Sequence, residues 1–320
     1  MSSAEAIRLA RVLRPPASLR ELRTRLASEA DCEQFVFQVR FPQGFVCPRC
    51  AVARGWRLHH GRLIECANGH KVSLTAGTRL HGSRQPLSTW LYAAYLVSTL
   101  TPGISALQLQ RQLGLTRYET AFQILHKIRS VLVAPGRERL RGAVEVDETF
   151  IGGKDPDRDG RGGDKVLVVG AVELLNRGAI GTAAARRPLG RVRLRVVANA
   201  SANSLAGFVE TEVERGAIVH TDGWDGYRRL ARSSYDHRRL VQGKNRTARP
   251  VLRHIHRVFS NLKAWLQGTH HGGVEPRYLP AYLNEYAFRF NRRFWRGPAF
   301  LRTVMLLLEP ARPHPRKHQR

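Results

Sequence analysis

Two aspartates in the sequence occupy positions from which they could bind metal ions together. Asp147 lies within the strand-like segment VEVDETF, and Asp222 ends the strand-like segment AIVHTDG. Side chains alternate along a strand, so Glu145 and Asp147 share one face. Carboxylates 75 residues apart in the chain (222 − 147) meet only if their strands are adjacent in one sheet, where a divalent cation offsets their repulsion. Such pairs hold the two metal ions that cut and rejoin phosphodiesters.

Two further functional residues are predicted on the helical segment HIHRVFSNLKAWL. His256 lies near its start, and Lys263 follows two turns later on the same face. His256 could bind a metal ion, and Lys263 could bind a phosphate group. An imidazole in the third position suits Mn²⁺ better than Mg²⁺. Taken one at a time, each aspartate is more typical of a hydrogen-bonded strand residue or a turn, so the residues alone leave that alternative open.

A second set of metal-binding residue types lies earlier in the chain. Cys47 and Cys50 form the pair CPRC, and Cys66 and His70 form a second close pair. Two close pairs of sulfur and nitrogen ligands are what a tetrahedral structural Zn²⁺ ion requires, and the segment between the pairs is long enough for a β-hairpin. The sequence therefore predicts a zinc ribbon. The alternatives to His70 as the fourth ligand are His59, His60 and His81.

The charge of the chain predicts a polyanionic partner. Its 53 Lys and Arg residues outnumber its 25 Asp and Glu residues, which gives a formal net charge of +28. Nucleic acid fits this charge best, because cations spread over a surface release the counterions of phosphates. An acidic membrane is the rival, but the sequence has no basic amphipathic helix, membrane-spanning run or apolar signal core. A compositional bias toward Arg would raise the charge but would not readily produce all of it.

The absence of a signal core also predicts a cytoplasmic protein, in which disulfides are rare. The four cysteines are then thiols or metal ligands. Cys32 lies in a helical pattern and is expected to be a small core residue.

The elements that must position these residues change type near residue 142. Up to that point the pattern is helical apart from the cysteine-rich segment, and after it strand-like segments alternate with helical ones. This order predicts an α/β catalytic domain with a mixed sheet. The expected domains are an N-terminal helical segment (17–44), a zinc ribbon (45–81), a helix-turn-helix DNA-binding region (86–135), a catalytic domain (142–293) and a basic C-terminal tail (294–320).

Three helices are expected over residues 86–134, and the last two have the pattern of a helix-turn-helix. In GISALQLQRQLGLTRYETAFQILHKIR, Gly114 falls at the turn and Thr116 could cap the second helix. A plain helical bundle shows the same apolar spacing, but a neighbouring zinc ribbon and the high charge favour DNA binding. The residues expected to face DNA are Arg117, Tyr118, Thr120, Gln123 and Lys127.

Several longer motifs resemble one known family. DETFIGGK and the preceding VEV resemble the bacterial insertion-sequence transposases that carry a zinc ribbon before a ribonuclease H-like domain. The resemblance runs from about Leu19 to Arg293, nearly the whole chain. It continues in TAGTRLH, PGISALQLQRQLGL, HTDGWDGY, FSNLKAWLQGTHHG and YLNEYAFRFNRR.

The resemblance implies roles for individual residues. Asp147 and Asp222 match the family's two catalytic aspartates, His256 falls at a third position that varies among Asn, Glu and His, and Lys263 matches the family's lysine. The three ribbon cysteines match as well. Many relatives have a fourth cysteine near residue 69, where this chain has Gly69 followed by His70.

The resemblance also implies partners and cofactors. The chain is expected to bind double-stranded DNA, namely the terminal inverted repeats of a mobile element and its target. It would cut and transfer strands with two Mg²⁺ or Mn²⁺ ions and one structural Zn²⁺ ion. It would act as a homo-oligomer, at least a dimer, in the bacterial cytoplasm at the nucleoid, and not at a membrane.

Three other functions remain possible from the sequence. The chain could be a DNA-binding repressor with an inactive nuclease site, a nuclease that cleaves without joining, or a zinc-stabilised adaptor. The intact pair of Asp147 and Asp222 argues against the first and the third. A joining assay separates a nuclease from a transposase, because the two share fold and metals.

Overall fold

The chain forms two compact units in a computed structural model. The model describes residues 12–58, 61–133, 136–152, 165–175, 189–241, 251–271 and 274–310. The first unit comprises Met1–Leu132 and Phe294–Arg320, and the second comprises Val133–Arg293. No helix among the described residues is both long and apolar enough to cross a membrane.

The first unit begins with two serine-capped helices rather than one continuous helical segment. Ser18 precedes α2 (Leu19–Arg25), and Ser28 precedes α3 (Glu29–Arg40). The Ser28 hydroxyl accepts the backbone N–H of Asp31, and the Asp31 carboxylate accepts the backbone N–H of Ser28. This reciprocal capping satisfies two donors that the helix cannot pair internally.

A small antiparallel sheet follows and is fastened to α3. Its strands, in the order β1-β2-β3, are β1 (Gly55–Arg57), β2 (Leu63–Cys66) and β3 (Lys71–Ser73). The Glu33 carboxylate of α3 lies 3.5 Å from the Arg57 guanidinium and 3.3 Å from that of Arg62. Arg62 also pairs with Glu29. These ion pairs hold the ribbon sheet against the helix.

The three expected helices are α4 (Leu87–Thr99), α5 (Ala106–Leu113) and α6 (Tyr118–Val131). Gly114 ends α5 with a φ of 62°, in the left-handed region that glycine adopts readily, so its predicted place at the turn is confirmed. The prediction that Thr116 caps the next helix is wrong. Arg117 holds the cap position and makes no side-chain capping hydrogen bond.

A further helix lies where the sequence analysis expected a basic tail from residue 294. Helix α10 occupies Arg296–Leu308, and only residues 311–320 lie outside the described part of this segment. The ring of Phe300 stacks on Phe35 of α3 at 5.8 Å and meets Tyr95 of α4 edge-on at 5.6 Å. The apolar run MLLL outweighs the flanking arginines, so this segment is buried in the first unit.

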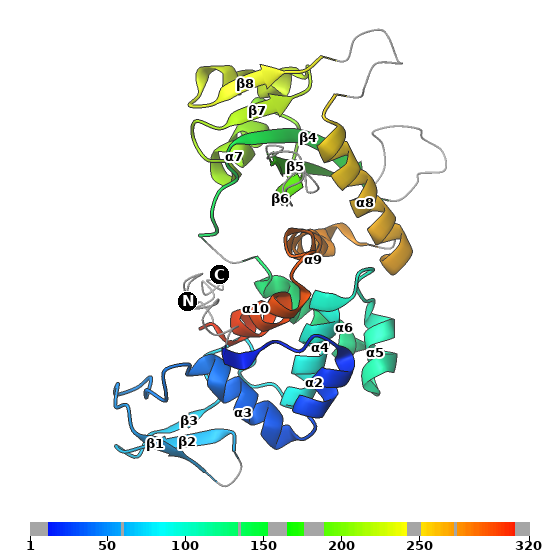
Figure 1. The fold of residues 1–320 in the computed structure, drawn as a ribbon. Coiled ribbons are helices and arrows are strands. Elements are labelled where there is room, and N and C mark those ends of the chain that lie inside the picture. Colours follow the sequence, from blue (N-terminus) through cyan, green and yellow to red (C-terminus); the bar gives the residue numbers. More distant parts are fainter. Residues whose placement is uncertain are drawn as a thin grey trace, which may run out of the picture. The chain divides into compact units, whose positions relative to one another are not determined.

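The second unit is built on a mixed five-stranded sheet with the order β6-β5-β4-β7-β8 (Figure 1). β4 pairs antiparallel with β5 and parallel with β7, β5 pairs antiparallel with β6, and β7 pairs parallel with β8. The two strand-like segments predicted around the aspartates correspond to β4 and β7, whereas β8 is a charged edge strand with no apolar pattern. The strands are β4 (Ala143–Ile151), β5 (Val166–Leu174), β6 (Leu189–Val196), β7 (Ile218–Thr221) and β8 (Asp236–Arg239).

Helices cover both faces of this sheet. α7 (Ala202–Glu212) and the 3-10 helix η1 (Asp225–Arg232) pack on one face, and α8 (Arg253–His270) and α9 (Leu279–Asn291) pack on the other. The apolar residues of α8 recur every three or four positions, so one stripe of the helix is buried and the opposite side is exposed. The helices thus bury the two faces of the sheet, and the ends of its strands remain available for a site.

Candidate active site and zinc centre

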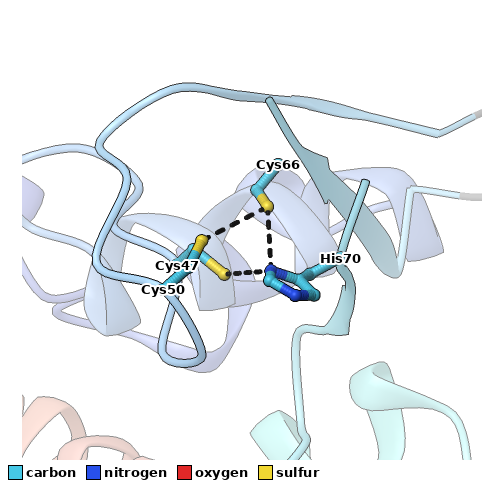
Figure 2. Close-up of side chains that lie close together, drawn as sticks. All are labelled: Cys47, Cys50, Cys66 and His70. Atoms are coloured by element: carbon cyan, nitrogen blue, oxygen red, sulfur yellow. Dashed lines mark hydrogen bonds between the residues drawn. The ribbon is translucent and has the colours of Figure 1, made fainter. Parts of the chain in front are cut away.

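Four metal-binding side chains meet beside the ribbon strands (Figure 2). Cys47 and Cys50 precede β1, Cys66 ends β2, and His70 immediately precedes β3. The Sγ atoms of Cys50 and Cys66 are 3.7 Å apart, and Cys66 Sγ lies 3.5 Å from His70 Nδ1. All four ligand atoms lie within 4.8 Å of one another. Around a tetrahedral ion with bonds of about 2.0–2.3 Å, neighbouring ligand atoms lie roughly 3.5–3.8 Å apart, so this donor set fits a structural Zn²⁺.

Each pair of zinc ligands lies in a tight backbone turn. The Ala51 N–H donates to the Cys47 carbonyl at 2.8 Å, and the Gly69 N–H donates to the Cys66 carbonyl at 2.8 Å. Burial raises the pKa of Cys47, but backbone N–H groups of the turn and the neighbouring thiols outweigh it and lower the pKa to about 6. The fold therefore favours the thiolate form that binds metal.

Of the four histidines considered as the fourth ligand, the structure describes His70 and His81. His70 takes the fourth position beside the three cysteines, and His81 is outside the group. His59 and His60 fall outside the described residues. Cys32 is fully buried in α3, as a core residue would be, and burial raises its pKa to about 12.

In the second unit, Asp147 lies on β4 and Asp222 directly follows β7, the parallel strand beside β4. Glu145 of β4 faces His220 of β7, an offset of 75 residues. The same offset separates Asp147 from Asp222, which directly follows the last residue of β7. The strands of the two aspartates are therefore neighbours, as the sequence predicts. The Oδ1 atom of Asp222 also accepts the backbone N–H of Trp224 at 2.9 Å, which fixes the turn that follows.

His256 of helix α8 contacts Asp147. Its Nε2 atom lies 2.9 Å from Oδ2 of Asp147. The Asp147 side chain is only 14% exposed, whereas that of His256 is 49% exposed. Burial raises the pKa of Asp147 and the charge of Asp222 adds to the rise, against the opposing effects of His256 and the Glu148 N–H. A divalent cation would offset the repulsion between the two carboxylates, and carboxylate oxygens with an imidazole nitrogen are donor types that suit Mn²⁺ and, less well, Mg²⁺.

Lys263 is exposed two turns after His256 on the same helix. In the described part of the chain no hydrogen bond or ion pair ties it to Asp147 or Asp222. Its position on the solvent side of α8 leaves the ammonium group accessible to a phosphate.

Glu145 and Gly170, two residues to which the sequence analysis gave no such role, hold α8 in place. Oε2 of Glu145 accepts the backbone N–H groups of His254 and Ile255 at 2.9 and 2.8 Å. Gly170, which pairs with Asp147 across β4 and β5, leaves room for Phe259 of α8. A Cβ at Gly170 would lie 2.7 Å from the Phe259 ring. The only sequence signal was the shared face of Glu145 and Asp147.

A buried tyrosine ties the two aspartate-bearing segments together on the other side of the sheet. Tyr227 of η1 is fully buried, and its hydroxyl donates to Oε2 of Glu148 at 2.6 Å. Burial and the Glu148 charge raise the pKa of Tyr227 well above its usual value. The bond links the segment after Asp222 to the strand of Asp147. The motif HTDGWDGY contains this tyrosine, but a strand pairing between distant segments was needed to reveal its partner.

The expected DNA-contacting residues of α6 differ in exposure. Arg117, Tyr118 and Gln123 are exposed, and Thr120 is half-buried. Lys127 is also half-buried, with its Nζ atom 5.4 Å from the ring centroid of Trp90. The first turn of α6 is therefore its most accessible part.

Comparisons with known proteins match both units. Residues 139–291 match the model of the ISXO2-like transposase domain, and residues 27–71 match that of the transposase zinc-ribbon domain. No curated protein matches the chain. A solved structure, the simian T-cell lymphotropic virus intasome in complex with PP2A regulatory subunit B56 gamma, is 12% identical with a TM-score of 0.29.

That alignment covers 62% of this chain and 65% of the solved chain, and a score this low supports no conclusion about fold or function. The two family matches together cover more than half of this chain, and their order along it agrees with the zinc centre and the mixed sheet. The chain thus belongs to the insertion-sequence transposases in which a transposase zinc ribbon precedes an ISXO2-like, ribonuclease H-like transposase domain.

Proposed function

We propose that this transposase binds the ends of its element and catalyses metal-dependent cleavage and transfer of DNA strands. Two observations carry the proposal: β4, which holds Asp147, pairs with β7, which Asp222 directly follows, and His256 lies 2.9 Å from Asp147. The residues come from three separate segments, and burial of a carboxylate beside a second carboxylate is costly without a cation.

Asp147 and Asp222 would hold Mg²⁺ or Mn²⁺, and His256 would complete or orient the set. Two such ions activate the attacking oxygen and stabilise the leaving oxygen of a phosphodiester. Glu145 keeps α8 against the strand of Asp147, so that His256 stays within reach of it. Lys263 would bind a DNA phosphate along the exposed side of α8. Hydrolysis would free a 3′-OH, which would then attack target DNA, so no covalent bond between protein and DNA is required.

The first unit would recognise the terminal inverted repeats. The zinc ribbon is fastened to α3 by ion pairs, and Arg117 and Tyr118 lie exposed at the start of α6. The net charge of +28 supports extensive phosphate contact. The protein would act at the nucleoid as a homo-oligomer of at least two copies, because two ends must be joined to one target.

The test is strand cleavage and joining on a labelled duplex that carries the element's terminal repeat, with Mg²⁺ and Mn²⁺ in parallel. The proposal expects metal-dependent nicking followed by joining to a second DNA. Binding without nicking would identify a repressor with an inactive site. Nicking without joining would identify a nuclease.

A further inference from the structure

An exposed tryptophan stands beside the candidate active site. The side chain of Trp224 is 44% exposed, two residues after Asp222. Its backbone N–H donates to the carboxylate of Asp222 at 2.9 Å, so one turn places both the carboxylate and the indole. A half-exposed tryptophan presents one apolar face and is a side-chain type that is enriched at binding surfaces.

The indole is fixed in position although it is exposed. Its Nε1 atom donates to the carbonyl of Ala200 at 3.2 Å. A Cβ at Gly226 would lie 2.5 Å from that nitrogen, so only glycine lets the pyrrole edge of the ring rest on the turn. The exposed area therefore belongs to an anchored ring, which would lose little conformational entropy on binding a ligand.

Two arginines and a second apolar side chain contact the residues on either side of Trp224. The carboxylate of Asp225 is shared by Arg228 at 2.6 Å and Arg239 at 3.5 Å, so two guanidinium groups face one acid. The Arg228 side chain is 70% exposed and that of Arg239 is 42% exposed. Val241, which is 71% exposed, lies over Gly223, where a Cβ would come within 3.2 Å of it.

An exposed aromatic ring near two arginines that share a single acidic partner matches one ligand class, the unpaired nucleotide. Its base has a π-face to stack on the indole, and its phosphates pair with guanidinium groups. Bases inside a duplex stack on one another, so a surface ring reaches only a terminal or extruded base.

We propose that Trp224 stacks on an unpaired nucleobase of the strand whose phosphate is held at Asp147 and Asp222, while Arg228 and Arg239 bind neighbouring phosphates. This inference rests on the proposed function, because it takes the two aspartates as the site of strand cleavage. It adds a contact that selects frayed or extruded DNA ends over continuous duplex.

The test uses a duplex with an unpaired thymidine overhang, in which one abasic nucleotide is moved through the overhang. Binding is measured by fluorescence anisotropy at one salt concentration for the wild type, Trp224→Ala, Trp224→Phe and Trp295→Ala. Trp295 is a matched control, since it is 57% exposed and lies in the first unit.

In the wild type, one abasic position should weaken binding roughly 5- to 100-fold. Trp224→Ala should weaken binding to a similar extent and abolish sensitivity to that position. Trp224→Phe should keep the sensitivity, because a ring remains although the hydrogen bond to Ala200 is lost. Trp295→Ala should behave like the wild type.

The stacking proposal would be overturned if the abasic nucleotide weakened binding by the same factor in Trp224→Ala as in the wild type at every position. The two changes would then act independently. A Trp224→Phe variant that behaves like Trp224→Ala would also overturn it, because the indole would then be an anchor for the turn. If Trp224→Ala changed the oligomeric mass but kept the wild-type dependence of binding on the abasic position, Trp224 would instead contact another protein chain. If only the stacking proposal is wrong, the wild type still binds and cleaves DNA. If the wild type neither binds nor cleaves DNA, the proposed function is wrong as well.

Discussion

The Glu145 carboxylate on β4 caps the helix that begins beside His254, 109 residues later in the chain. Besides the two backbone bonds, Oε1 of Glu145 lies 2.8 Å from Nδ1 of His254. Leu252, at the start of α8, offers no side-chain acceptor, so the cap comes from the sheet. The cap therefore fixes the first turn of α8 relative to the strand that carries Asp147.

Replacement of Glu145 by Ala should lower both stability and activity. It leaves two backbone donors at a buried helix start without an acceptor, and should cost about 2–3 kcal/mol in the free energy of unfolding. Glu145→Gln keeps one acceptor oxygen and should cost less. Urea unfolding measures the loss of stability, and cleavage rates at urea concentrations below the unfolding transition measure the loss of activity. Glu210→Ala, on the exposed side of α7, is the control. If Glu145→Ala had the same free energy of unfolding as the wild type, Glu145 would not act as the cap of α8.

The purified protein should contain about one Zn²⁺ per chain. Cys50→Ser removes one of the four ligands, so the ribbon should lose its metal and unfold, and DNA binding should weaken while the second unit stays folded. Elemental analysis and circular dichroism measure this. Cys32→Ala is the matched control, because that thiol is buried away from the centre and should leave the zinc content unchanged. A well-folded preparation without zinc would contradict the assignment.

DNA binding should weaken steeply as salt rises. The slope of log affinity against log salt is about −0.9 for each phosphate neutralised on duplex DNA. Arg117 is exposed at the start of α6, so Arg117→Ala should make the slope shallower by about one unit and weaken binding to all sequences. A titration of end DNA with salt measures it. An unchanged slope would place Arg117 outside the interface.

The stability of the first unit should fall in mild acid through His126. Burial, and then the charge of Arg129, lower the pKa of His126 from 6.5 to about 4. The unfolded chain takes up this proton near pH 6.5, but the folded chain resists it, so stability is complete above that pH and declines as pH falls toward about 4. His126→Gln removes the titration and should flatten the decline. Thermal unfolding over this pH range checks the expectation, and parallel curves for the two proteins would exclude His126 as the cause.

The strands and most helices could be predicted because their signals are local. VEVDETF and VLVVGAVEL show β-branched residues in runs, and α8 shows an apolar stripe. Helix α10 was not predicted, because its apolar run lies between arginine-rich segments that are typical of a basic tail. Edge strand β8 has the sequence DHRR, which takes its strand form only from pairing with β7.

The sequence singles out candidate site residues but does not reveal the contacts that position them. Asp147 and Asp222 were recognisable because each ends or interrupts a strand-like segment. The cap from Glu145 and the bond from Tyr227 to Glu148 join residues far apart in the chain. Such contacts depend on strand order and on the packing of α8, which no local pattern contains.

The central claim is that Asp147 and Asp222 share catalytic metal ions. Each substitution by Asn removes one negative charge from the site, and should reduce cleavage and joining by roughly 1000-fold or more while leaving end binding nearly intact. His256→Ala removes a neutral ligand and should reduce activity less. His256→Glu, which adds a charged oxygen ligand, should retain some activity with Mg²⁺.

The most direct measurement is cleavage and joining by Asp147→Asn and Asp222→Asn on a labelled end substrate, with Mg²⁺ and Mn²⁺ in parallel and end binding measured on the same preparations. The account predicts bound but uncut DNA for both variants in both metals. Wild-type cleavage by Asp147→Asn would contradict it.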